Sequence, residues 1–147
     1  MTEARFHELF SSVVSCAAQL VYTGKTTGSY RLLSAADRLS RSFADPGFDA
    51  MVPLADGIAL AQCYLDIVQV VVGTAIELVV DLEEEIRSAS FVRCGSLIDA
   101  IDQVLADGAP RGNPMRVMLT QDRVGTGNGL VLVGGERRLP IGAEVER

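Results

Sequence analysis

Two neighbouring segments near the start of the chain carry an apolar residue at every third or fourth position, and this spacing limits the possible folds more than any other feature. Such spacing aligns side chains along one face of a helix. Thr2 can cap the first helix, which we predict to run to about Tyr22. The apolar positions of this first segment are Phe6, Phe10, Val13, Ala17 and Leu20.

A second helix with the same spacing is predicted after a short turn. Ser29 can begin it, and residues 23–28 before it (Thr-Gly-Lys-Thr-Thr-Gly) are typical of a turn. Two helices joined by so short a loop lie antiparallel. Each would keep an apolar face after pairing with the other, so we expect a homodimer in which two hairpins form a four-helix bundle. The apolar positions of the second helix are Leu32, Ala36, Leu39 and Phe43.

The remaining chain changes from a purely helical pattern to a mixed one. We predict a helix over 53–73, a strand over 75–82, a helix over 91–106, and strands over 115–120 and 130–133. Asn128-Gly129 favours a hairpin between the last two strands, and the acidic residues 83–85 read as a solvated connection. The predicted fold class is therefore α+β, with a helical hairpin over 1–50 and a small α/β lobe over 51–147.

Charge and apolar content exclude several classes of partner. The formal net charge of −6 repels nucleic acid and anionic lipid surfaces. Apolar runs such as residues 67–72 are far shorter than the roughly 20 residues that span a bilayer, and residues 1–8 are charged. We therefore expect a cytoplasmic protein with no membrane segment. The three cysteines have neither metal-ligand nor disulfide spacing, so we predict no metal site; they are Cys16, Cys63 and Cys94.

His7 is the only histidine of the chain and the leading candidate for chemistry. It follows Phe6 by one residue, about 100° round the helix, so it lies beside the packed face and not within it. Glu8 can accept a proton from the imidazole or orient it, which leaves one ring nitrogen as a nucleophile. The same face continues through small side chains that allow a partner to dock: Ser11, Val14 and Ala18. A surface histidine without a role is the alternative.

Two stretches are similar to phosphate-binding loops, but their contexts favour other structures. Gly24-Lys25-Thr26 has no strand before it and lacks the earlier glycine of such a loop, so we interpret it as the turn between helices. The glycine-rich residues 125–129 precede a strand and not a helix, which favours the tip of a hairpin.

Residues 7–108 resemble the sensor histidine kinases of the LytS type. In that family the phosphoacceptor begins a motif of the form H-F-L-F-N-S-L, and residues 7–13 here read His-Glu-Leu-Phe-Ser-Ser-Val. The start His-Glu-Leu is also similar to the phosphoacceptor box of the more common histidine kinases. Val52-Pro53-Leu54 and residues 63–69 (Cys-Tyr-Leu-Asp-Ile-Val-Gln) correspond to the family elements V-P-L and A-Y-L-x-I-x-Q. The resemblance implies a phosphoacceptor at His7 and an ATPase-like second lobe.

The lobe departs from the family where ATP would bind. The family arginine before the strand is Val71 here, and the magnesium-binding motif E-N-A-x-x-H-G aligns with residues 102–108. Asp102 and Gln103 take the places of its Glu and Asn, but Gln is one methylene longer than Asn and would misplace its oxygen at a magnesium ion. Residues 134–138 (Gly-Gly-Glu-Arg-Arg) stand where D-x-G is expected, and few residues follow for a lid. We therefore expect a truncated lobe without autokinase activity.

The resemblance implies a role in two-component signalling. Our leading hypothesis is a histidine phosphotransfer protein, in which His7 exchanges a phosphoryl group with the aspartate of a response-regulator receiver domain. The chain would need no cofactor of its own, because the receiver domain supplies the magnesium. One alternative is a non-catalytic pseudokinase or scaffold that binds a receiver domain or a histidine kinase. Another is a residual nucleotide site at Asp102 and Gln103.

Overall fold

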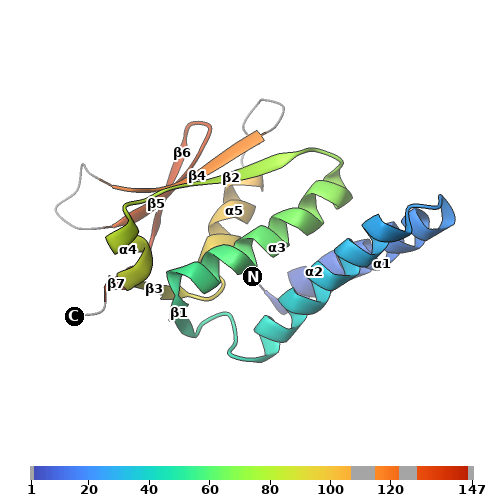
Figure 1. Ribbon diagram of the computed structural model, residues 1–147, viewed down its shortest axis with the longest axis horizontal. Coiled ribbons are helices and arrows are strands. Elements are labelled where there is room, and N and C mark those ends of the chain that lie inside the picture. Colours follow the sequence, from blue (N-terminus) through green and yellow to red (C-terminus); the bar gives the residue numbers. More distant parts are fainter. Residues whose placement is uncertain (1, 107–114, 123–128, 146–147) are drawn as a thin grey trace.

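Two long antiparallel helices lie at one side of the molecule and a small sheet lies at the other, with a third helix between them (Figure 1). These helices are α1 (Glu3–Tyr22), α2 (Thr26–Ala44) and α3 (Leu54–Val72). The computed structural model describes residues 2–106, 115–122 and 129–145. The α+β class and the N-terminal helical hairpin are confirmed.

Helix α1 has the bounds that its sequence predicts. The side-chain oxygen of Thr2 accepts a hydrogen bond from the backbone N–H of Arg5 at 3.2 Å, which satisfies one of the free donors at the helix start. Phe6, Val13 and Ala17 are buried along the face that the spacing predicts.

Helix α2 begins one turn earlier than predicted. Gly24 has a φ of 80°, in the left-handed region that glycine adopts without cost, and the helix starts at Thr26 and not at Ser29. Ser29 is buried in the first turns, where its hydroxyl donates to the carbonyl of Ala17 at 3.1 Å. The prediction was wrong because a serine was taken as a cap although it bonds the neighbouring helix.

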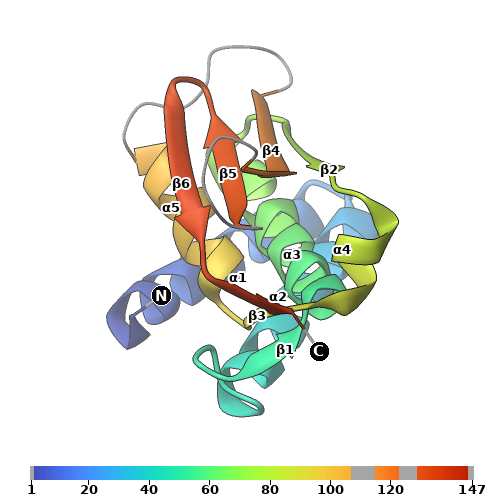
Figure 2. The ribbon, with the colours of Figure 1, turned by 90° about the vertical axis from the view of Figure 1, so that its left-hand side faces the viewer.

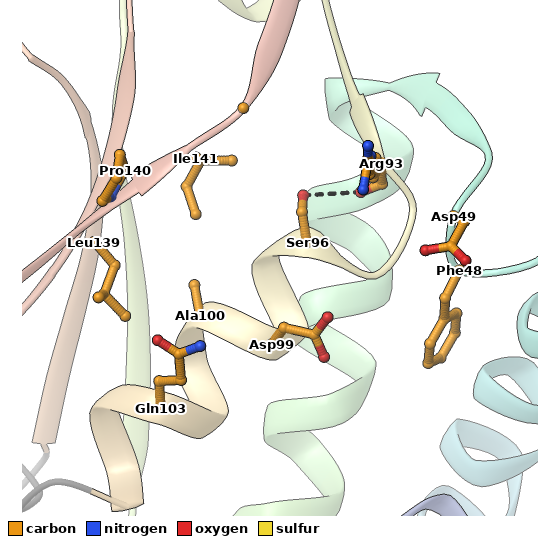
Figure 3. Close-up of a pocket in the computed structure, with 11 residues that line it drawn as sticks. Phe48, Asp49, Arg93, Ser96, Asp99, Ala100, Gln103, Leu139, Pro140 and Ile141 are labelled. Carbon is orange, nitrogen blue, oxygen red and sulfur yellow. Dashed lines mark hydrogen bonds between the residues drawn. The ribbon is translucent and has the colours of Figure 1, made fainter. Parts of the chain in front are cut away.

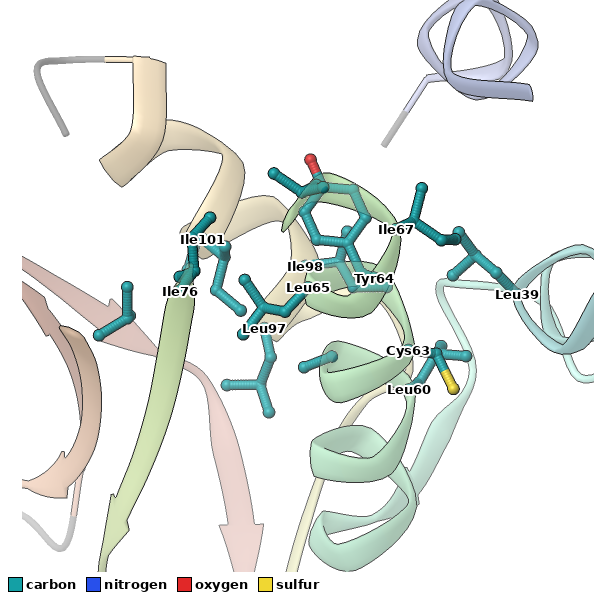
Figure 4. Close-up of a cluster of buried hydrophobic side chains, with 14 of the residues drawn as sticks. Leu39, Leu60, Cys63, Tyr64, Leu65, Ile67, Ile76, Leu97, Ile98 and Ile101 are labelled. Atoms are coloured by element: carbon teal, nitrogen blue, oxygen red, sulfur yellow. The ribbon is translucent and has the colours of Figure 1, made fainter. Parts of the chain in front are cut away.

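Helix α3 is the centre of the hydrophobic core. One of its faces carries Leu60 and Ile67 toward Leu39 of α2, and another carries Leu65 toward the lobe (Figure 4). The helix ends at Gly73, with a φ of 77°, as predicted. Among the described residues, α3 alone is long and apolar enough to cross a membrane by length and composition, and 44% of its most apolar window is buried. This is compatible with the core helix of a soluble protein.

A four-stranded mixed sheet forms most of the lobe. Its strands are β2 (Ile76–Asp81), β4 (Met115–Gln121), β5 (Leu130–Gly134) and β6 (Arg137–Ile141), in the order β2-β4-β5-β6. Strands β2 and β4 are parallel and the other pairs are antiparallel. Helices α3 and α5 (Ser96–Ala106) cover one face of this sheet (Figure 2). The predicted strands over 75–82, 115–120 and 130–133 are confirmed, whereas β6 was not predicted.

A second, three-stranded antiparallel sheet corrects the prediction of a helix over 91–106. Strand β3 (Ser90–Arg93) lies between β1 (Met51–Pro53) and β7 (Ala143–Val145), and α5 begins only at Ser96. Phe91 and Val92 favour a strand once partners on both sides satisfy their backbone groups. The expected connection at residues 83–85 also differs, because Glu84 and Glu85 form the first turn of a short helix, α4 (Glu84–Ala89).

The hairpin and the lobe share one hydrophobic cluster. It extends from Phe6 and Leu39 in the helices to Leu132 in the sheet. The division of the chain into a functional hairpin over 1–50 and a lobe over 51–147 stays a prediction. The predicted hairpin tip at Asn128 lies outside the described residues, although Gly129, the residue before β5, is described.

Candidate functional site

The imidazole of His7 projects from α1 into solvent. The side chain is 72% exposed, whereas the ring of its neighbour Phe6 is buried and stacks on Phe43 with a centroid separation of 4.7 Å. Because Phe6 holds this face of the helix against α2, the next residue must point about 100° away from the contact. The predicted position of His7 beside the packed face is confirmed.

The carboxylate nearest to His7 comes from one turn earlier and not from the next residue. Glu3 Oε1 lies 3.6 Å from His7 Nε2, across the i,i+4 spacing that brings side chains together on a helix. Glu8, which we expected to orient the ring, has its carboxylate 3.4 Å from Arg5 Nη1. Side chains of consecutive helical residues point about 100° apart, which carries Glu8 away from the imidazole. The i,i+4 spacing between Glu3 and His7 was the sequence signal for this contact.

The predicted docking residues lie on the same face of α1 as His7, and two of the three also belong to a larger apolar surface. Ser11, Val14 and Ala18 are all exposed. Val14 and Ala18 line a shallow pocket of about 270 Å³ together with residues of both hairpin helices. We call its four exposed apolar residues the hairpin patch: Val14, Ala18 and Val21 of α1, and Leu33 of α2. Helix α3 of the same chain covers part of the apolar surface of the hairpin, and this patch is a part that remains exposed.

Asp102, one of the two residues that the resemblance assigns to a nucleotide site, binds helix α1. Its Oδ1 accepts a hydrogen bond from Arg5 Nη2 at 3.1 Å and another from the Tyr64 hydroxyl at 2.9 Å. Tyr64 is only 2% exposed. We call this group of three residues the Asp102 bridge. Sequence reasoning missed Arg5 and the role of Tyr64; a tyrosine on the buried face of α3 needs a hydroxyl partner, and that need was the available signal.

Gln103, the second residue that the resemblance assigns to a nucleotide site, faces a different part of the molecule. It lines an open pocket of about 390 Å³ between α5 and β6, together with Arg93, Asp99 and Leu139 (Figure 3). In this pocket the Ser96 hydroxyl donates to the carbonyl of Arg93 at 2.9 Å. Asp102 lines another pocket, which also contains Arg5 and Tyr64. Asp102 and Gln103 therefore do not converge on one cavity where they could hold a nucleotide together.

Burial and hydrogen bonding make Tyr64 a pH-dependent part of the structure. Burial raises the pKa of the Tyr64 hydroxyl well above its ordinary value, and the neighbouring Asp102 carboxylate raises it further. The same carboxylate raises the pKa of Arg5, so the guanidinium stays charged. Burial also raises the pKa values of the Cys63 and Cys94 thiols.

We expect the free energy of unfolding to fall above about pH 10, the ordinary value for tyrosine. Between the unfolded and the folded pKa of Tyr64 the native state binds more protons than the unfolded state, so stability is complete below this range and is lost as pH rises. Tyr64→Phe should show a shallower alkaline fall, measured as the urea midpoint across this pH range. Tyr30→Phe, at an exposed position, is the control. Parallel curves for Tyr64→Phe and the wild type would contradict this assignment.

No group of three or more His, Cys, Asp or Glu side chains able to hold a metal ion is found within residues 2–106, 115–122 and 129–145. Comparison of the chain with models of known protein families found no match, and comparison with curated proteins found none either.

Proposed function

We propose that this chain is a histidine phosphotransfer protein of two-component signalling, in which His7 exchanges a phosphoryl group with the aspartate of a receiver domain. The observation that carries the proposal is the exposed imidazole of His7 on the first helix of an antiparallel hairpin. Attack on an aspartyl phosphate held by another domain requires a nucleophile that projects from the surface in a fixed position. His7 projects in this way, and the packing of Phe6 on Phe43 supports the helix beneath it.

The transfer step needs only a nitrogen lone pair from this chain. A neutral imidazole has one ring nitrogen that carries no proton, and this nitrogen can act as a nucleophile. The free ring nitrogen attacks the phosphorus of the aspartyl phosphate, an N–P bond forms, and the P–O bond to the aspartate breaks. The aspartate leaves as a carboxylate. The other ring nitrogen then releases its proton to water or to Glu3, whose carboxylate lies 3.6 Å from the ring.

The lobe supports a phosphotransfer role better than an autokinase role. In this proposal it descends from an ATPase-like lobe, as its resemblance to LytS-type kinases implies. Asp102 is engaged by Arg5 and Tyr64, and Gln103 lines a separate pocket, so the two family positions do not act together. The receiver domain would supply the magnesium ion, which leaves this chain the task of presenting a positioned ring.

We propose a cytoplasmic protein that forms a homodimer. The interface between the two copies is the hairpin patch. Val14, Val21 and Leu33 are each about half exposed in the single chain, and a second copy packed on them would complete a four-helix bundle. His7 lies seven residues before Val14, which is about 10 Å along the helix. The imidazole and Ser11 therefore lie toward the open end of the hairpin, beyond the patch, where a receiver domain can approach. In this arrangement Val14 and Ala18 contact the second copy and not the receiver.

The proposal is tested by incubating the purified protein with receiver domains from the same organism, each phosphorylated in advance with labelled phosphate. We expect rapid transfer of the label to this chain from at least one receiver. A receiver that binds tightly but transfers no label would favour the alternative, a scaffold in which His7 has no chemical role.

A further inference from the structure

We propose that Asp102 is a positioning residue for phosphoryl transfer at His7, because it anchors the first turns of α1 to the core of the lobe. The inference rests on the proposed function. It gives Asp102 a role different from the nucleotide binding that its place in the lobe implies. Asp102 touches neither the imidazole nor a reacting atom, so it acts through Arg5.

The anchor on the lobe side is rigid. Tyr64 is 2% exposed on the central helix α3, and its hydroxyl donates to Asp102 Oδ1 at 2.9 Å. Any movement of Asp102 away from this position would leave the hydroxyl of a buried tyrosine without its hydrogen-bond partner, which is unfavourable. The Asp102 side chain is itself only 33% exposed, so water screens its contacts less than those of a fully exposed carboxylate.

The anchor reaches α1 at the residues that surround His7. Arg5 donates to Asp102 Oδ1 at 3.1 Å and to Glu8 Oε2 at 3.4 Å. Arg5 lies two residues before His7, and Glu8 lies one residue after it. The Asp102 bridge therefore connects segments that are 97 residues apart in sequence and holds the helical turn that carries the imidazole.

This turn needs an anchor because it lies at the start of a helix. Helix ends fray, and the first donors of α1 have only the Thr2 cap as a local partner. Phe6 fixes the side of the turn that faces α2, and Arg5 fixes the side that faces α5. Two contacts on different sides of the helix determine its rotation as well as its position. The direction of the imidazole then stays constant as the receiver approaches, which is what in-line transfer requires.

The test measures the rate of transfer at saturating phosphorylated receiver and, separately, the receiver concentration that gives half of that rate. For Asp102→Ala and for Arg5→Ala we expect the saturated rate to fall about tenfold, because loss of orientation slows the step within the complex. The half-saturating concentration should change less than about threefold, since the docking surface is intact. The double variant should be no slower than either single variant, because both substitutions remove the same contact.

The exposed ion pair between Arg116 and Glu77 is the matched control. Arg116 Nε lies 3.2 Å from Glu77 Oε2, close to the 3.1 Å between Arg5 Nη2 and Asp102 Oδ1. This pair joins β4 to β2, away from the hairpin. Arg116→Ala should transfer at the wild-type rate. Amide hydrogen exchange gives a second reading: exchange at residues 5–10 should be faster in Asp102→Ala and unchanged in Arg116→Ala. Asp102→Asn keeps an oxygen for Tyr64 and should recover part of the rate, which also covers a failure of the alanine variant to fold.

Different results would overturn the two proposals. If the wild type accepts label but the Asp102 and Arg5 variants transfer at the wild-type rate with unchanged exchange, the positioning role is excluded and the proposed function stands. Additive losses in the double variant would exclude it as well. If the wild type accepts no label from any receiver, the proposed function fails and the positioning role fails with it.

Discussion

Replacement of His7 with alanine is expected to abolish phosphoryl transfer from every receiver that labels the wild type. No other imidazole exists in the chain to take its place. The substitution should leave the fold intact, because the side chain is 72% exposed and substitutions at such surface positions usually change stability by less than about 0.5 kcal/mol. The measurements are label retained on the chain and the melting temperature of the variant.

Substitutions at Glu3 and Glu8 distinguish the role of the His7 nucleophile from the roles of the nearby carboxylates. Glu3→Gln keeps the size of the residue beside the ring but removes its charge, and it should slow transfer by less than about tenfold, since water can take the released proton. Glu8→Gln should have a smaller effect, because Glu8 contacts Arg5 and not the imidazole. Label that persists on His7→Ala would show that the acceptor is another residue.

Placing acidic residues on the hairpin patch is expected to convert the proposed dimer into monomers. In the double variant Val21→Asp with Leu33→Asp, dimer formation would bury four carboxylates without partners, and burying an unpaired charge is strongly unfavourable. We expect the dissociation constant to rise at least about 100-fold. The single chain should still fold, because both side chains are about half exposed in it. Sedimentation over a range of concentrations measures the change.

Val72→Asp is the matched control for this prediction. Val72 is a similarly exposed valine, but it lies at the end of α3 and outside the hairpin patch. The control should keep the wild-type association. A wild-type protein that sediments as a monomer, or a double variant that remains a dimer, would exclude the hairpin patch as the interface between copies.

The helical hairpin could be predicted from the sequence because its signals are local. Thr2 caps α1, the apolar spacing sets the buried face, and Gly24 allows the turn. The three-stranded sheet could not be predicted in this way. Ser90–Arg93 becomes a strand only through pairing with residues 51–53 and 143–145, which are distant in sequence. Its apolar residues also fit the start of a helix when they are considered alone.

The candidate site shows the same division between local and distant information. The exposure of His7 follows from its angle to Phe6, which the helix period determines. The partners of Asp102 depend on how the hairpin packs against α3 and α5, and no pattern within either segment contains that relation. The resemblance to kinases drew attention to Asp102 as a nucleotide-binding residue. In the structure its carboxylate accepts hydrogen bonds from Arg5 and Tyr64.

The most direct test of a phosphoacceptor role is to locate the phosphoryl group on the labelled wild-type protein by tandem mass spectrometry under neutral conditions. We predict a single modified site, His7, with a bond that is stable in base and cleaved by acid, as expected for phosphorus on nitrogen. Modification of Ser11 or Ser12 in the same helix, or no modification from any receiver tested, would contradict it.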